Sequence, residues 1–365
     1  MKKVLIVAAD GLSKSGVPNV FMNIIKNLSP RGFIFDVVYF DSTQTYHLDE
    51  INTVGGKAIF IKTNHNKKGK FKKLYDKMML GKRIRKVIKE NGPYDVVHSF
   101  KGFDSGYILK AAKKEKIEKR FSHLCFTYVK SKNPLINIID KIEISKTKKY
   151  SVNAIFDSEK TMNNNLPGYE RNKLIRNYFN DSELQYAPLA KEEDAIKLIQ
   201  IGSYSFNKNQ KFTLEVFRKI LEKKPNSKLH YIGFPNPDDL DYYNKLVESV
   251  KEDKLEDNVV FHKFDVKQKD IFAECNYCIF PSIYESFGIV PVEAQAVGLK
   301  CFCSDTVTRE NNCGGCTYLP LNDIDAWVNA ILSDFDNTKG KHEKFDVSLF
   351  STKTITEVYV DLYSK

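Results

Sequence analysis

The chain has 365 residues, 42% of them hydrophobic, with 57 Lys and Arg against 46 Asp and Glu and seven cysteines. This composition excludes a disordered or fibrous chain, and no apolar run approaches the roughly 18 residues that span a bilayer. At roughly 100–200 residues per domain, the length predicts two domains.

The N-terminus predicts a buried first strand. The apolar run 4–8 meets Asp10 and Gly11 almost at once, whereas a signal peptide needs roughly 7–15 apolar residues. Seven cysteines without a secretion signal favour reduced thiols and a cytoplasmic protein.

Short apolar runs alternate with helical patterns along the chain. We expect strands in the first half at 4–8, 34–40, 58–62, 95–99, 120–126 and 153–157, and helices at 17–28, 71–89 and 105–114. The second half restarts the series, with strands at 196–202, 228–233, 258–262, 277–281 and 299–304, and helices at 210–222, 239–250, 286–297 and 323–332. Such alternation predicts parallel sheets covered by helices on both faces.

The polar segment 180–194 separates the two series and is interpreted as a linker. We therefore predict an α/β protein of two doubly wound, Rossmann-like domains that face a central cleft. The first domain spans 1–182 and is joined by a C-terminal helix within 348–365. The second domain spans 190–347.

Positive charge is concentrated in the first half. Residues 1–150 hold 31 Lys and Arg against 13 Asp and Glu, a balance of +18, whereas the remainder holds 26 against 33, a balance of −7. Segment 64–89 alone contains 11 Lys and Arg interleaved with apolar residues. A basic amphipathic helix suits anionic membranes or nucleic-acid phosphates, although an ordinary covering helix with lysines on its outer face has the same pattern.

The stretch 281–298 carries the most informative chemical pattern. A strand is expected to end at Pro281, and Ser286 is expected to N-cap a helix that stops at Gly298. The free amides near 287–289 would then form an anion site at the positive end of the helix. Glu285 and Glu293 would lie on one side of it at different depths, which suits two hydroxyl groups of an extended nucleotide sugar.

This pattern, E-x7-E between a strand and a helix, resembles the signature of family 4 retaining glycosyltransferases with the GT-B fold. The similarity is to the bacterial capsule and exopolysaccharide type. It implies that Glu285 contacts the donor sugar, that Glu293 binds the ribose, and that the diphosphate lies on the turn formed by Phe287, Gly288 and Ile289.

The resemblance extends to 201–209, where it assigns Lys208 to the leaving diphosphate. A fixed cation there stabilises the charge that develops in the transition state. The family usually has an Arg five residues earlier, and Ser203 occupies that place here. We expect Lys211 or the helix dipole to compensate.

In the first half, the resemblance assigns Gly16 to a glycine-rich turn near the donor phosphates, although Val17 replaces a second glycine. It also matches His123 to a strand-end histidine near the donor sugar, with Cys125 in place of a second histidine. His98, which ends another predicted strand, is a secondary candidate. We expect His123→Ala mainly to slow transfer.

Three other patterns in the sequence could form a site. Cys275-x2-Cys278 and Cys313-x2-Cys316 have zinc-ribbon spacing, but only the second pair spans a tight turn, so buried free thiols are favoured. D-x-D pairs occur at 239–241, 323–325 and 334–336, where helix capping explains them. A glycosidase pair needs carboxyl groups that flank one bond, which two glutamates from one helix supply poorly.

These patterns predict a retaining, metal-independent glycosyltransferase without a cofactor. It would move a hexose or N-acetylhexosamine from a UDP-linked donor to a cell-surface polysaccharide or lipid-linked glycan. We expect it to be cytoplasmic, and peripheral at the inner membrane face through its basic half. The alternative is a non-catalytic protein that binds nucleic acid or another anionic surface, although no nucleic-acid-binding module is present.

Overall fold

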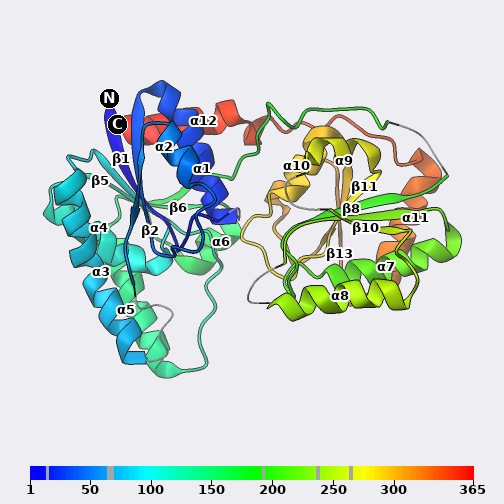
Figure 1. Cartoon of the computed structure of the whole chain (residues 1–365), viewed down its shortest axis with the longest axis horizontal. Coiled ribbons are helices and arrows are strands. Elements are labelled where there is room, and N and C mark those ends of the chain that lie inside the picture. The colour runs from blue at the N-terminus through cyan, green and yellow to red at the C-terminus, as the bar shows by residue number, and fades with distance from the viewer. Residues whose placement is uncertain (14–15, 64–69, 191–193, 236–238, 263–265) are drawn as a thin grey trace. The chain divides into compact units, whose positions relative to one another are not determined.

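Parallel strands alternate with helices in both halves of the molecule, which confirms the predicted α/β class (Figure 1). The computed structural model describes residues 1–13, 16–63, 70–190, 194–235, 239–262 and 266–365. They divide into unit 1, residues 1–178 and 352–365, and unit 2, residues 179–351.

Unit 1 is built on a seven-stranded parallel sheet of order β3-β2-β1-β4-β5-β6-β7. Its strands are β1 (Lys2–Val7), β2 (Phe33–Tyr39), β3 (Lys57–Phe60), β4 (Val96–Ser99), β5 (Lys119–His123), β6 (Asn153–Phe156) and β7 (Asn172–Leu174). Its helices are α1 (Gly16–Leu28), α2 (Leu48–Thr53), α3 (Lys70–Asn91), α4 (Ser105–Lys114), α5 (Pro134–Tyr150), α6 (Glu159–Asn165) and α12 (Thr352–Ser364).

Strand alternation sends the side chains of β1 into two separate cores. Val4 and Ile6 pack with residues of α1 and α12, whereas Leu5 and Val7 pack with residues of α3 and α4. Successive side chains of a strand point to opposite faces, so a strand that is buried on both faces is apolar throughout. This explains why the continuous run 4–8 predicts a strand.

Unit 2 is built on a six-stranded parallel sheet of order β10-β9-β8-β11-β12-β13. Its strands are β8 (Lys197–Ile201), β9 (Lys228–Ile232), β10 (Val259–His262), β11 (Tyr277–Phe280), β12 (Lys300–Ser304) and β13 (Cys316–Leu319). Its helices are α7 (Gln210–Lys223), α8 (Leu240–Glu252), α9 (Gln268–Glu274), α10 (Val290–Val297) and α11 (Ile324–Thr338).

Both faces of the second sheet are also covered. Tyr277 and Ile279 of β11 pack with residues of α7, α8 and α11, and Cys278 and Phe280 pack with residues of α9 and α10. The central strand β11 is thus buried on both sides, and the loop that follows it carries the candidate site.

Two features of the chain bear on the predicted membrane contact. None of the helices in the described ranges combines the length and apolarity that a bilayer-spanning helix needs. The predicted basic segment 64–89 corresponds to α3, apart from residues 64–69, which lie outside the described residues.

Candidate functional site

The turn between β11 and α10 differs from the prediction at its helix end. Ser286 is not the N-cap, because α10 begins at Val290 with Ile289 as the cap residue. Gly288 has a φ of +76°, a left-handed conformation that interrupts right-handed helix. Residues 287–289 therefore form a separate turn in front of the helix.

This turn presents free backbone amides. Within the described residues, the N–H groups of Phe287, Gly288 and Ile289 donate no hydrogen bond. Gly288 is left-handed and Ile289 right-handed, an alternation that directs successive amides to one side and favours anions. A Cβ at position 288 would lie 3.0 Å from the Phe280 ring, so both φ and packing favour glycine.

A buried polar network holds the turn in place. The amide nitrogen of Asn311 donates to the carbonyl oxygens of Phe287 and Gly288 at 3.0 and 3.1 Å, and the Tyr318 hydroxyl donates to Asn311 Oδ1 at 2.9 Å. Gln295 of α10 donates to the Asn311 carbonyl at 2.9 Å. Sequence reasoning missed this network. The sequence gives one sign of this network, because Gln295 stands among the apolar residues of α10.

Lys208 and Glu285 form an ion pair between two loops of unit 2. Lys208 Nζ lies 2.5 Å from Glu285 Oε1, with the two side chains 21% and 14% exposed. The methylene groups of Lys208 pack at Gly202, where an added Cβ would lie 3.3 Å from them, and its ammonium lies 5.3 Å from the centroid of the Phe280 ring. The structure thus brings together two predicted site residues that are 77 positions apart.

Asn207 connects the same two loops and was not predicted. Its side-chain amide donates to the Tyr284 carbonyl at 2.8 Å, and its Oδ1 accepts from the Tyr284 amide at 3.0 Å. Its own carbonyl accepts from the Ile283 amide at 2.9 Å. These three bonds fix the loop after β8 against the loop after β11, and so fix the neighbouring Lys208 against Glu285.

Glu293 lies in the first turn of α10 and is half-buried. Its carboxylate makes no hydrogen bond or ion pair to the part of the chain that the structure describes. Burial raises the pKa of Glu293 to about 7, because removal from water disfavours the charged form. An unpaired, partly buried carboxylate is well suited to accept hydrogen bonds from ligand hydroxyl groups.

Lys211 and Ser203 are the two secondary candidates of unit 2, and their contacts are with residues other than Lys208 and Glu285. The Lys211 ammonium is 5.5 Å from the centroid of the Tyr242 ring, which belongs to α8. The Ser203 carbonyl accepts a hydrogen bond from Gln210 at 3.0 Å. These contacts link Lys211 to α8 and Ser203 to the start of α7.

In unit 1, His98 and His123 are fully buried and stacked. Their ring centroids are 5.4 Å apart with an interplanar angle of 3°, and His98 Nδ1 lies 2.6 Å from the Tyr363 hydroxyl of α12. Burial lowers the pKa of His123 to about 3 and lowers the pKa of His98 well below its ordinary value. Both rings are therefore neutral near pH 7.

Gly16 and Cys125 complete the predictions in unit 1. Gly16 begins α1, and an added Cβ would meet nothing within 4 Å. The neighbouring residues 14 and 15 of the predicted turn lie outside the described residues. Burial raises the pKa of Cys125 well above its ordinary value, so this thiol is protonated.

The C-x2-C and D-x-D pairs, which the sequence offers as alternative metal motifs, contain residues that cap a helix, form an ion pair or lie in the core. Among the described residues, no group of three or more His, Cys, Asp or Glu is arranged to hold a metal ion. Asp323 caps α11 by accepting from the Ala326 amide at 2.9 Å, and Asp334 accepts from Tyr277 and pairs with Lys300. Cys275 and Cys278 are free and buried.

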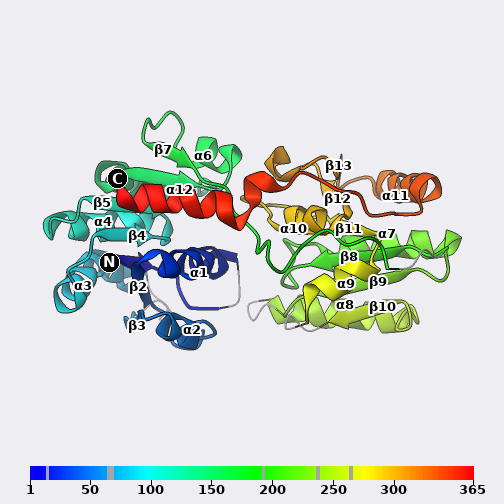
Figure 2. The same cartoon turned by 90° about the horizontal axis from the view of Figure 1, so that it is seen from above.

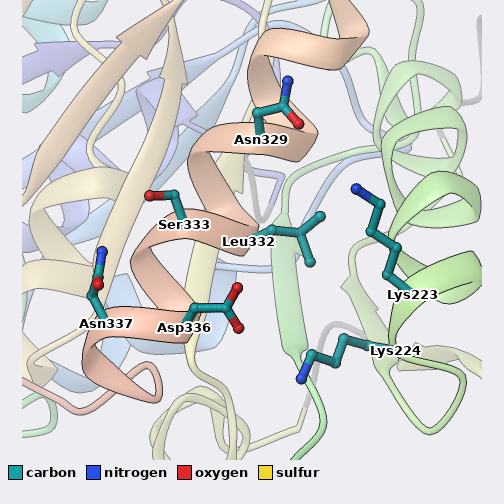
Figure 3. Close-up of a pocket in the computed structure, with 7 residues that line it drawn as sticks. All are labelled: Lys223, Lys224, Asn329, Leu332, Ser333, Asp336 and Asn337. Carbon is teal, nitrogen blue, oxygen red and sulfur yellow. The ribbon is translucent and has the colours of Figure 1, made fainter.

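Figure 3 shows an open surface depression between α7 and α11, lined by Lys223, Lys224, Asn329, Leu332, Ser333, Asp336 and Asn337. None of the predicted site residues lines it. Lys224 is paired with Asp194 at 2.6 Å. The depression therefore has no part in the candidate site.

The chain resembles known glycosyltransferases in sequence. Residues 181–313 match the family model described as glycosyl transferases group 1. EpsF of Bacillus subtilis (strain 168), whose name gives glycosyltransferase as a provisional activity, is 24% identical over 332 residues, or 86% of this chain and 82% of EpsF. Mannosylfructose-phosphate synthase of Agrobacterium fabrum is 28% identical over 137 residues, or 36% of this chain and 30% of that enzyme.

Solved structures resemble it over its whole length. HepE of Anabaena in complex with UDP has a TM-score of 0.78 at 14% identity and covers 100% of both chains. Sucrose-phosphate synthase of Thermosynechococcus elongatus has a TM-score of 0.76 at 16% identity, covering 100% of this chain and 98% of that one.

The fold is therefore GT-B, as the sequence resemblance predicts. In sequence, residues 181–313 are similar to glycosyl transferases group 1, and the chain is similar to EpsF over most of its length. The matched segment 181–313 contains Lys208, Glu285 and Glu293 and the turn between the two glutamates.

Proposed function

We propose that this protein transfers a hexose or N-acetylhexosamine from a UDP-linked donor to a cell-surface polysaccharide or lipid-linked glycan. The transfer would retain the anomeric configuration, as in family 4, and require no metal. The observation that carries the proposal is the Lys208–Glu285 pair beside a turn with free amides and an unpaired Glu293. HepE, a structural neighbour, was solved with UDP, with UDP and glucose, and with UDP-glucose.

Each part of a nucleotide sugar has a chemical counterpart among these residues. The amides of the turn 287–289 suit the diphosphate, and Glu293 suits the ribose hydroxyl groups. Lys208 suits the leaving diphosphate, which gains negative charge as the bond to the sugar breaks. Glu285 is placed by its contact with Lys208 and suits the donor sugar.

The proposed reaction exchanges one bond for another on the same face of the sugar. The bond between the anomeric carbon and the diphosphate oxygen breaks, and its electron pair leaves with the diphosphate. The acceptor hydroxyl oxygen bonds to the anomeric carbon, and its proton passes to the leaving diphosphate. This route needs no separate general base.

Unit 1 would contribute the acceptor side and His123. A neutral imidazole both donates and accepts hydrogen bonds, and neither ring nitrogen of the buried His123 has a hydrogen-bond partner in the described chain, so a sugar hydroxyl that reached the ring would find both a donor and an acceptor. Gly16 would allow the donor phosphates to approach the start of α1. A lipid-linked acceptor would bring the protein to the inner face of the membrane, where the basic first half suits anionic lipids.

Nucleotide binding tests this proposal directly. UDP, GDP, ADP and a panel of UDP-sugars would be compared by thermal shift, and the preferred donor should raise the melting temperature because it binds only the folded state. Lys208→Gln should weaken UDP binding at least tenfold, whereas Lys219→Gln, on the exposed side of α7, should not. Chelator should leave transfer unchanged, and the product anomer would be assigned by NMR. Lack of stabilisation by any nucleotide would refute the proposal.

A further inference from the structure

Helix α5 of unit 1 has its polarity reversed. Leu135, Ile138 and Ile142 are 68%, 55% and 48% exposed, whereas the residues that α5 buries are Glu143 and Thr147. Residues spaced three and four apart share one helix face, so the three apolar side chains form an exposed stripe. We call Leu135, Ile138 and Ile142 the α5 stripe.

The two polar residues that α5 buries are both paired. Glu143 lies 2.8 Å from Lys77 Nζ of α3, and the Thr147 hydroxyl donates to the Phe103 carbonyl at 2.9 Å. Helix α4 packs against both α3 and α5, and Gly106 lets it approach Thr147 closely. These polar contacts and the packing of Ile144 against the core hold α5 in place and leave the α5 stripe uncovered.

Positive charge surrounds the α5 stripe. Exposed lysines flank it before and along the helix, and no ion pair within the described ranges engages them: Lys130, Lys132, Lys141 and Lys149. The two acidic residues of segment 129–149, Asp140 and Glu143, accept from Tyr128 and pair with Lys77. The exposed face therefore combines apolar and cationic groups without a carboxylate.

Helix α3 buries most of the apolar residues whose side chains are described there, although Tyr75 is 57% exposed. Leu80, Ile84, Val87 and Ile88 are buried against the sheet and α4. Its basic pattern therefore includes an ordinary covering face, whereas α5 carries three neighbouring exposed apolar side chains on one face.

We propose that α5 lies in the interface of an anionic lipid bilayer. The α5 stripe would enter the boundary between headgroups and acyl chains, and the flanking lysines would meet lipid phosphates. The charge complementarity favours this occupant over a second copy of the chain, which would bring like charges together. The inference rests on the proposed function, because it locates the membrane partner of a lipid-linked acceptor.

Co-sedimentation with vesicles tests the surface. Full-length protein should bind phosphatidylglycerol vesicles at low salt and bind phosphatidylcholine vesicles at least tenfold less. The triple variant Leu135→Glu, Ile138→Glu and Ile142→Glu should lose at least tenfold of this binding. The matched control Leu240→Glu and Leu349→Glu, at exposed apolar positions of unit 2, should bind as wild type.

Charge is tested separately. Lys130→Gln, Lys132→Gln and Lys141→Gln together should weaken binding several-fold, whereas Lys113→Gln and Lys114→Gln, at exposed positions of α4, should weaken it less. Equal losses in both sets, or no vesicle binding by wild type, would overturn the proposal. A wild-type dimer in sedimentation velocity that the triple glutamate variant abolishes would also overturn it. UDP binding, measured on the same variants, should stay unchanged and reports independently on the proposed function.

Discussion

Lys208 and Glu285 share a short ion pair, 2.5 Å from Nζ to Oε1, that joins the loop after β8 to the loop after β11. The carboxylate offsets the charge of the ammonium before any ligand arrives. A bound diphosphate would therefore compete with Glu285 for Lys208, and the two residues would have opposite effects on nucleotide affinity.

Glu285→Gln should bind UDP as tightly as wild type or up to about tenfold more tightly, because Lys208 loses its anionic partner. Transfer should nevertheless slow by about 100-fold, since a proposed contact to the donor sugar is lost. Calorimetry with UDP and initial-rate measurements separate the two effects. Weaker UDP binding in Glu285→Gln would contradict this account of the pair. Glu252→Gln, exposed on α8, serves as the matched control.

Glu293 should make both stability and UDP binding depend on pH. The carboxyl group titrates near 4.5 when unfolded and near 7 when folded. Between these values the folded state binds more protons, so stability falls as pH rises, by at most about 3 kcal/mol. Glu293→Gln should remove this fall, which melting curves from pH 4 to 8 would show as a rising advantage over wild type.

The same residue should impose a second pH dependence. Ribose hydroxyl groups donate to the charged carboxylate, so wild-type affinity for UDP should increase as pH rises through 7. Glu293→Gln should bind UDP about tenfold more weakly at pH 8 and show no such increase. A variant with unchanged affinity and unchanged pH dependence would discredit the ribose assignment.

Asn311 should control nucleotide binding without touching the ligand. Asn311→Ala removes the donor to two carbonyl oxygens of the turn, Phe287 and Gly288, and should cost roughly 1–3 kcal/mol in stability. Tyr318→Phe keeps both of these bonds and removes the hydrogen bond that the Tyr318 hydroxyl donates to Asn311 Oδ1. Its cost in stability should therefore be smaller. Urea unfolding and UDP calorimetry of the two variants check this order, which a more damaging Tyr318→Phe would reverse.

Gly288→Ala should weaken UDP binding by at least tenfold. Alanine is strained at a φ of +76°, and its Cβ would press on the Phe280 ring. The matched control is Gly168→Ala in unit 1, where φ is +65° but no atom lies within 4 Å of an added Cβ. Gly168→Ala should therefore show only the backbone cost in melting experiments. Equal effects of the two changes on UDP binding would contradict the proposed role of Gly288 in the diphosphate-binding turn.

Sequence patterns predicted the buried strands well, since a strand such as β11 is a continuous apolar run. The edge strands β7 and β13 were not predicted, because Asn172–Leu174 and Cys316–Leu319 are short and only partly buried. Ser286 was wrongly predicted as an N-cap. Local capping preference competes there with the left-handed Gly288, which separates the turn from the helix.

The site was only partly predictable for a similar reason. Lys208, Glu285 and Glu293 are predicted from motif resemblance, but Asn207 and Asn311 act through tertiary contacts with carbonyl groups far along the chain. Asparagine is common in loops, so neither residue stands out in the sequence. The reversed polarity of α5 was also hidden, because its buried Glu143 depends on Lys77 of another helix.

His123 should distinguish a structural from a catalytic role through one substitution. The imidazole titrates near 6.5 when unfolded and near 3 in the buried site, so between these values the unfolded state binds more protons. Stability therefore falls as pH drops below 6.5. His123→Phe keeps an aromatic ring beside His98 and Phe100 and removes this titration. Its melting temperature relative to wild type should rise as the pH is lowered from 6 to 4.

Transfer by His123→Phe at pH 7.5 should fall at least tenfold with UDP affinity nearly unchanged, because the imidazole is proposed to contact the donor sugar. Wild-type transfer by a well-folded His123→Phe would leave the histidine a packing role alone.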